Sequence, residues 1–258
     1  MSGLIDLTRD GPLATVTLNR PERLNALTLP MWQGLAEHFE TLAGDDSVRC
    51  VILTGAGKAF AAGADIDEFD TVRATPEQAK DYDLVMRRAL AAVRDCPHPV
   101  VARIRGTCVG GGLELAAMAD LRYANEGARF GVPINRIGVV MAHPELAGLL
   151  AHCGPAQVLE LLLEARIVGA AEAQQMGLLN QVFADEALDE EVATRVHRIT
   201  EGAPLVNRWH KQFVRRLTAA AQVPPEELGE AYRFLETNDY AEGLAAFRDK
   251  RRPDFTAS

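Results

Sequence analysis

The sequence predicts an α/β fold in which mostly parallel strands alternate with helices, followed by a region of helices only. Two short apolar runs, residues 48–54 and 100–104, lack polar alternation, as expected of strands that are buried on both faces. Helical patterns separate these runs, and after about residue 184 no strand pattern follows. The length of 258 residues suits one large domain with a small appendage.

The first half of the chain supplies the elements of this core in order. Residues 4–18 form two alternating runs around a turn and predict a β-hairpin. A helix follows, with Thr28 as its expected amino-terminal cap and Pro30 in its first turn. After the strand at 48–54, the next helix begins at the capping-box sequence Thr75-Pro76-Glu77-Gln78.

The second half moves from strand to helix. The strand at 100–104 leads into a glycine-rich turn and the apolar segment 113–119. Candidate helices in the carboxy-terminal part cover residues 187–201, 204–221, 225–237 and 240–250. We therefore expect a core over residues 1–202 and a helical region over residues 203–258, joined near Gly202.

Charge and hydropathy exclude several classes of partner. The 27 basic and 36 acidic residues give a net charge of −9, which argues against a nucleic-acid-binding surface. No apolar run approaches the roughly 20 residues of a membrane helix. The first residues lack the pattern of a secretory signal. We expect a cytoplasmic protein that binds neither nucleic acid nor membrane.

Rare residues exclude some chemistries. Only three serines occur, and none lies in the Gly-x-Ser-x-Gly turn of a hydrolase. The four cysteines include no Cys-x-x-Cys and the six histidines no His-x-x-x-His, so we predict no metal site and interpret the cysteines as buried thiols.

Two glycine-rich segments, residues 51–66 and 106–114, have the same order of strand, small residues and helix. Neither matches a Walker loop or a dinucleotide fingerprint. Three adjacent glycines, Gly110 to Gly112, allow a ligand to approach the backbone at a helix amino terminus, where N–H groups lack partners. The two segments can therefore aim two N–H groups at one oxygen. The alternative for each is a tight turn with close helix packing.

Glu114 favours the functional interpretation. It lies three residues beyond Gly111, on the same helix face, in an otherwise apolar segment. A carboxylate in such surroundings is costly unless it is paired, hydrogen-bonded or used in chemistry.

These residues carry a family resemblance. The sequence Gly110-Gly111-Gly112-Leu113-Glu114-Leu115-Ala116 resembles the crotonase superfamily, which is the enoyl-CoA hydratase/isomerase family. The other similar segments are residues 19–27, 51–66, 120–124, 130–133, 154–156, 173–180 and 242–251. The resemblance spans nearly the whole chain.

The resemblance implies a crotonase-like spiral of ββα turns and a carboxy-terminal helical region used for trimerisation, in a homotrimer or a hexamer of two trimers. It implies an acyl-CoA thioester as ligand, with no separate cofactor. An enolate made from that thioester is held by two backbone N–H groups, which fall on Ala64 and Gly111. The substrate site would include Ala62, Asp65, Ile66 and Gly110. Asp65 is also a candidate cap for the helix that follows it.

The chain departs from the family at its second glutamate. In hydratases of the family two glutamates flank the thioester, one acting on water at the β-carbon and the other at the α-carbon. Glu114 matches the first, whereas Ile134 stands in place of the second. His143 or Glu145, in the altered loop that follows, can assist. Alternatively, His143 caps the next helix and Glu145 complements its dipole.

Basic residues are candidates for binding the phosphates of coenzyme A. Arg23, Lys250 and Arg251 lie in the similar segments. Each can equally be a solvated surface charge.

Three functions remain open from the sequence. Hydration of an enoyl-CoA with Glu114 as the principal group is the first. An isomerase, decarboxylase or other CoA lyase is the second, because enolate chemistry needs only one proton carrier. The third is an acyl-CoA-binding protein without turnover.

Overall fold

The computed structural model describes residues 3–219 and 224–258. The first two residues of the amino-terminal segment, and residues 220 and 221 of the helix predicted over 204–221, lie outside this description. Within the described ranges, no helix combines the length and the apolar character that a membrane crossing requires.

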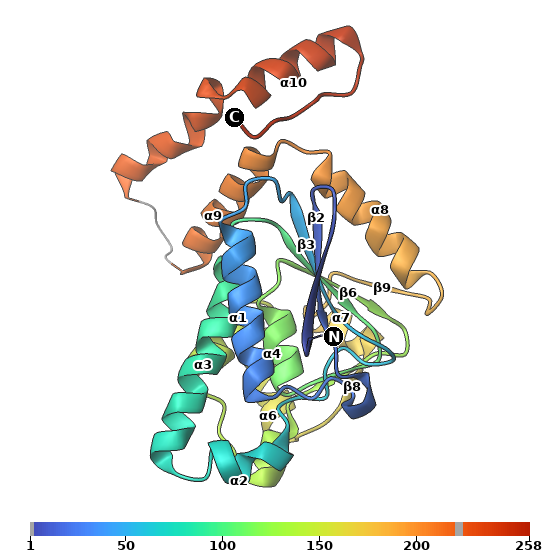
Figure 1. Ribbon diagram of the computed structural model, residues 1–258, viewed down its shortest axis with the longest axis vertical. Coiled ribbons are helices and arrows are strands. Elements are labelled where there is room, and N and C mark those ends of the chain that lie inside the picture. Colours follow the sequence, from blue (N-terminus) through green and yellow to red (C-terminus); the bar gives the residue numbers. More distant parts are fainter. Residues whose placement is uncertain (1–2, 220–223) are drawn as a thin grey trace.

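A six-stranded sheet forms the centre of the core (Figure 1). Its first two strands form the antiparallel hairpin that the sequence predicts, and every other neighbouring pair is parallel. In spatial order the strands are β1 (Ile5–Asp10), β2 (Leu13–Leu18), β3 (Cys50–Gly55), β4 (Val100–Ile104), β6 (Leu121–Asn125) and β9 (Gln181–Phe183).

A second, smaller sheet contains β5 (Thr107–Val109), β7 (Arg129–Gly131) and β8 (Val168–Gly169). β5 directly follows β4 and β7 directly follows β6, so in these two turns of the chain the first strand belongs to the large sheet and the second to the small one. An isolated bridge between Ala61 and Cys108 continues this pattern into the segment after β3. The expected spiral of ββα turns is confirmed.

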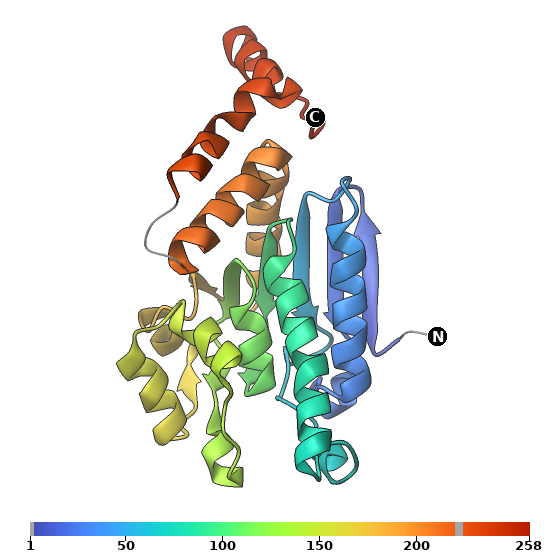
Figure 2. The same ribbon diagram turned by 90° about the vertical axis from the view of Figure 1, so that its left-hand side faces the viewer.

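Helices cover both faces of the large sheet (Figures 1 and 2). One face carries α1 (Leu29–Ala43), α3 (Pro76–Asp95) and α4 (Gly111–Ala117), and the other carries α8 (Leu188–Thr200). Because side chains alternate along a strand, Val51 and Leu53 of β3 face the first group and Cys50 and Ile52 face α8. The prediction of a strand buried on both faces is confirmed, and all four cysteines are buried free thiols.

The starts of the two long helices differ from each other. Thr75 and Gln78 form the predicted capping box at α3. Thr28 stands at the cap position of α1, but its buried hydroxyl makes no hydrogen bond, so its predicted capping role is wrong. Glu68 accepts a hydrogen bond from the Leu29 N–H at 2.8 Å instead. A carboxylate from a later segment thus satisfies the end of this helix.

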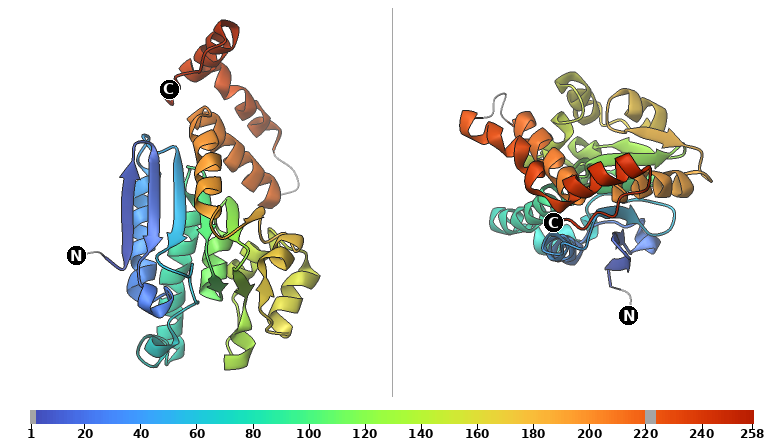
Figure 3. Two further views of the ribbon diagram at one scale, coloured as in Figure 1. Left: turned by 90° about the vertical axis from the view of Figure 1, so that its right-hand side faces the viewer. Right: turned by 90° about the horizontal axis from the view of Figure 1, so that it is seen from above.

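Short elements connect the spiral. They are η1 (Pro21–Arg23), η2 (Ile66–Glu68), α2 (Phe69–Val72), η3 (Pro133–Ile137), α5 (His143–Leu150), α6 (Pro155–Leu163) and α7 (Ala170–Gln175). The segment from α5 to α7 lies on the opposite side of the molecule from the β1–β2 hairpin (Figures 2 and 3).

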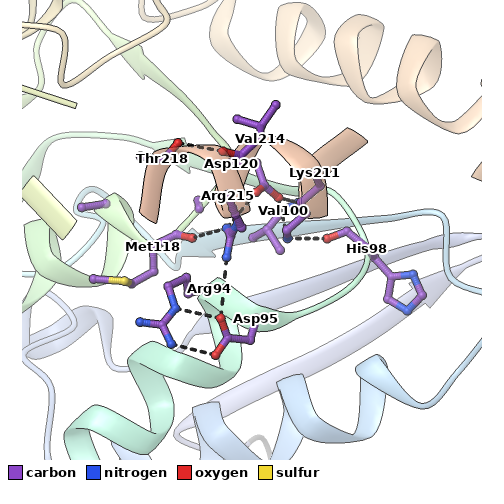
Figure 4. Close-up of polar contacts among 12 residues, drawn as sticks. Arg94, Asp95, His98, Val100, Met118, Asp120, Lys211, Val214, Arg215 and Thr218 are labelled. Atoms are coloured by element: carbon purple, nitrogen blue, oxygen red, sulfur yellow. Dashed lines mark hydrogen bonds and ion pairs between the residues drawn. The ribbon is translucent and has the colours of Figure 1, made fainter. Parts of the chain in front are cut away.

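The carboxy-terminal region contains α9 (Pro204–Ala219), η4 (Pro225–Glu236) and α10 (Asn238–Asp249). Two ion pairs join α9 to the core. The Asp120 carboxylate contacts Lys211 Nζ at 2.7 Å and Arg215 Nη2 at 2.8 Å (Figure 4). The segments η4 and α10 extend away from the core (Figures 1 and 2). These helices follow the predicted ranges, although η4 is wound as a 3-10 helix. The domain boundary at 202/203 stays a prediction.

Candidate active site

Two backbone amides converge at the start of α4, as the glycine pattern predicts. A Cβ atom added to Gly111 would lie 3.5 Å from the Ala64 nitrogen, so the two segments are in contact. Among the hydrogen bonds of residues 3–219 and 224–258, neither the Ala64 N–H nor the Gly111 N–H has a protein acceptor. Two N–H groups without acceptors at one point can bind a ligand oxygen that carries negative charge.

Glycines set the direction of these amides. Gly63 has φ of +105° and Gly110 has φ of +50° with ψ of −126°, conformations that side chains with a Cβ avoid. The torsions of each glycine orient the next peptide unit, which carries the Ala64 or the Gly111 N–H. Gly112 serves close packing, because an added Cβ would lie 2.6 Å from the Ala61 carbonyl oxygen. The close-packing interpretation is therefore confirmed at Gly112, while the ligand-binding interpretation of Gly110 and Gly111 stays a prediction.

Glu114 lies in the first turn of α4 and is 7% exposed. Burial, and secondly the charge of Glu145, raise the pKa of its carboxyl group to about 7, while Arg73 acts in the opposite direction. A carboxyl group with such a pKa can both donate and accept a proton near neutral pH. This is the property required of an acid/base group.

The amides and Glu114 line one cavity of about 100 Å³. Glu145 lines it from α5, opposite the contributions of α2, α3 and α4. The rest of the wall is largely apolar and includes Phe69, Met86, Ile134, Val139 and Met141. Because pockets for whole cofactors typically measure about 300–1,000 Å³, this cavity can enclose only the reacting end of a large ligand.

The cavity brings together seven of the predicted site residues. They are Ala64, Ile66, Gly110, Gly111, Glu114, Ile134 and Glu145. Two others, Ala62 and Asp65, lie in the segment around Ala64 but outside the cavity wall. The Ala62 N–H donates to the Leu24 carbonyl at 3.0 Å. Asp65 is buried and accepts a hydrogen bond from the Asp67 N–H at the start of η2, as the capping interpretation predicts.

Four predicted residues are not brought to the cavity. Arg251, the first of them, is exposed and pairs with Glu242 at 2.6 Å. His143 is exposed at the first position of α5, with Ala142 as the cap residue and no side-chain cap bond, so the capping prediction is wrong. Arg23 is exposed and paired with Asp67. Lys250 is exposed at the end of α10, at the opposite end of the molecule from α2 (Figure 1).

The sequence did not point to several residues of the wall. Arg73, with its guanidinium over the rings of Phe69 and Tyr82, forms an ion pair with Asp83 at 3.2 Å. Asp83 also pairs with Arg87 one helical turn later, at 3.6 Å. Pairs of this spacing are common on exposed helix faces, so the sequence carried no signal that this one borders a cavity.

The fold and the site together suit an enzyme that uses an oxyanion hole and an acid/base group. Two convergent N–H groups can stabilise an oxyanion, and a buried carboxyl group with a pKa near neutrality can move protons beside it.

Comparison with known proteins agrees with this class. The sequence model of the enoyl-CoA hydratase/isomerase family matches residues 8–258. A protein named probable enoyl-CoA hydratase, from Mycobacterium leprae, is 36% identical over 246 residues, which cover 93% of each chain. A short-chain-enoyl-CoA hydratase from Clostridium acetobutylicum is 30% identical, over 95% of each chain.

A solved structure is similar throughout. The crystal structure of an enoyl-CoA hydratase/carnithine racemase from Magnetospirillum magneticum has a TM-score of 0.98 and 61% sequence identity, and the match covers 100% of this chain and 97% of that one. The chain belongs to the enoyl-CoA hydratase/isomerase family.

Proposed function

We propose that this protein catalyses the reversible syn addition of water to a 2-enoyl-CoA, as an enoyl-CoA hydratase-like lyase. The observation that carries the proposal is the shared cavity of the Ala64 and Gly111 amides and the Glu114 carboxyl group. The names of the related hydratases support the same reaction class.

The chemistry follows from these groups. The thioester carbonyl oxygen accepts hydrogen bonds from both amides, which stabilise the negative charge of the enolate. Glu114 in its carboxylate form takes a proton from water while the water oxygen bonds to the β-carbon. The electron pair of the double bond moves to the thioester, and the α-carbon then receives a proton. In the reverse direction, protonated Glu114 gives its proton to the leaving hydroxyl group.

The proposed reaction requires no separate cofactor, because coenzyme A is part of the substrate. The small apolar cavity encloses the acyl atoms next to the thioester, and the coenzyme A moiety lies outside it. Arg23, whose guanidinium lies 3.9 Å from the Asp65 carboxylate, remains a candidate for binding the phosphates of coenzyme A. Lys250 follows α10, which lies at the opposite end of the molecule from α2 (Figure 1), so it can contribute only in an assembly.

The proposed assembly is a homotrimer or a hexamer of two trimers, formed through the carboxy-terminal region. Its support is the set of large apolar side chains that the described part of this region leaves exposed, namely Val214, Leu217, Tyr232, Leu235, Tyr240, Leu244 and Phe247. The cytoplasmic location expected from the sequence belongs to the same proposal.

Hydration of short and medium 2-enoyl-CoA thioesters tests the proposed reaction. We expect the wild-type protein to convert crotonyl-CoA to its 3-hydroxy product, and Glu114→Gln to lower kcat by about 10²–10⁴-fold, because Gln cannot carry the proton. Loss of the enoyl absorbance and product chromatography measure the rate.

The same assay separates the alternatives. Migration of the double bond in a 3-enoyl-CoA without hydration would assign the protein to the isomerases. Tight thioester binding without turnover would identify an acyl-CoA-binding protein. Glu77→Gln, an exposed glutamate in the first turn of α3, is the matched control and should leave kcat unchanged.

A further inference from the structure

Glu145 is a buried carboxylate that the protein leaves without hydrogen bonds. Its side chain is 1% exposed, and within the described chain neither carboxylate oxygen has a hydrogen-bond partner. Leaving such a group without hydrogen bonds is costly, so its retention in a cavity wall calls for a ligand or a reaction. The cavity that it lines also holds Glu114 and the two oxyanion amides.

The surroundings of Glu145 allow it to carry charge. It stands in the first turn of α5, where the helix dipole favours an anion. The nearest cation is Arg87, whose Nε lies 3.7 Å from Glu145 Oε1 and has no hydrogen-bond partner. Arg87 also contacts Asp83, and Asp83 is paired with Arg73. Arg73 and Asp83 also act on the pKa of Glu114, Arg73 lowering it and Asp83 raising it.

The two glutamates are coupled. The charge of Glu145 is the second cause, after burial, of the raised pKa of Glu114. Because the pKa of Glu114 is raised, Glu114 keeps its proton up to about pH 7. This arrangement places one proton donor and one proton acceptor beside the same substrate.

We infer that Glu145 is the catalytic residue that exchanges a proton with the α-carbon of the acyl thioester, in place of the missing carboxylate at Ile134. The inference rests on the proposed function for the identity of the ligand. Ile134 lines the same cavity and is apolar, so this part of the wall offers no proton carrier of its own. Glu145 restores a pair of carboxylates from a different element, α5 instead of η3.

Each step balances with these two groups. In elimination, the Glu145 carboxylate takes the α-proton, and the electron pair of that C–H bond forms the enolate held by the amides. The enolate expels the β-hydroxyl group, which leaves as water after it receives the proton of Glu114. In hydration, the roles reverse: Glu114 takes a proton from water, and protonated Glu145 gives one to the α-carbon.

Exchange of the α-hydrogens of butyryl-CoA in D₂O isolates the role of Glu145, because a saturated thioester forms the enolate without any hydroxyl group to expel. We expect Glu145→Gln to slow this exchange by at least about 100-fold, and Glu114→Gln to leave it within about threefold of wild type. Both variants should slow crotonyl-CoA hydration. Glu77→Gln is again the matched control.

A second variant distinguishes a catalytic role from a structural one. In the double variant Ile134→Glu/Glu145→Gln, a carboxylate returns to the cavity from η3, and we expect exchange to recover at least about tenfold over Glu145→Gln. Thermal unfolding checks that each variant is folded. If Glu145→Gln were inactive only because of a folding defect, the double variant would gain nothing, which contradicts the inference.

The outcomes also separate this inference from the proposed function. Hydration and exchange that both persist in Glu145→Gln overturn the inference and leave the hydratase proposal intact. A wild-type protein that exchanges the α-hydrogens through Glu145 but hydrates no enoyl-CoA overturns the hydratase proposal and leaves the inference intact. A wild-type protein with neither activity overturns both.

Discussion

Glu114 makes the stability of the protein depend on pH. Its pKa in the folded chain is about 7, against an ordinary value of 4.5. Below pH 4.5 the carboxyl group is protonated in both the folded and the unfolded state. Between pH 4.5 and 7 the unfolded chain releases this proton and the folded chain keeps it, so folding becomes less favourable as the pH rises. Above pH 7 the carboxyl group is ionised in both states, so the loss of stability no longer grows with pH.

Glu114→Gln removes this penalty, because Gln is uncharged at every pH. We expect the variant to gain little free energy of unfolding near pH 4.5 and about 3 kcal/mol above pH 7, from a shift of about 1.4 kcal/mol for each pKa unit. Urea unfolding across this pH range measures the difference from wild type. A gain that does not grow with pH would contradict the assignment, and Glu77→Gln should show no such trend.

The sequence identified Glu114 but not the full role of Glu145, for a physical reason. Glu114 follows a run of glycines and stands among apolar residues, so its burial could be inferred locally. Glu145 follows a proline in a first helical turn, where exposed glutamates are common. Only the packing of α5 against α4 shows that Glu145 is buried and lines the cavity. Burial that depends on distant segments leaves no local pattern.

Among the elements, the start of α4 depends most on one backbone conformation. A Cβ at Gly110 is strained at its φ of +50° and ψ of −126°. In Gly110→Ala we expect the next peptide unit to rotate and the Gly111 N–H to leave the cavity. Loss of one oxyanion donor lowers kcat by about 10²–10³-fold, with a smaller change in KM. Steady-state kinetics with crotonyl-CoA measures both constants.

Gly11→Ala provides the matched control for this change. Gly11 also has a positive φ, of +54°, but it lies in the turn of the β1–β2 hairpin with open space around it. The substitution should cost about 1 kcal/mol of stability through backbone strain and leave kcat unchanged. Equal losses of kcat in both variants would show that backbone strain alone explains the effect of Gly110→Ala.

Local signals predicted most elements of the fold. The capping box of α3 lies within four residues of sequence, and the structure contains it as predicted. The start of α1 was misread because its N–H partner is Glu68, about 40 residues away. The strands of the small sheet are two or three residues long, too short to show a period. The spiral was therefore predicted from the family resemblance and not from the strand pattern.

At the scale of the whole molecule, η4 and α10 of the carboxy-terminal region extend away from the core (Figures 1 and 2). Phe247 of α10 is 84% exposed, and six other large apolar side chains among the described residues of the region are also exposed. Apolar surface of this kind on a soluble chain usually marks an interface, and identical chains most often cover it by symmetric assembly.

A charge on α10 should therefore disrupt the proposed trimer or hexamer. Phe247→Glu would bury an unpaired carboxylate at the interface, which costs several kcal/mol in each subunit, and we expect light scattering during size-exclusion chromatography to show monomers. Leu84→Glu is the matched control, because Leu84 is an exposed leucine of α3, outside the carboxy-terminal region, and this variant should keep the mass of the wild-type assembly. A monomeric wild-type protein, or a Phe247→Glu variant that keeps the wild-type mass, would contradict assembly through α10. The role of Lys250 would then have to be sought on the surface of a single chain.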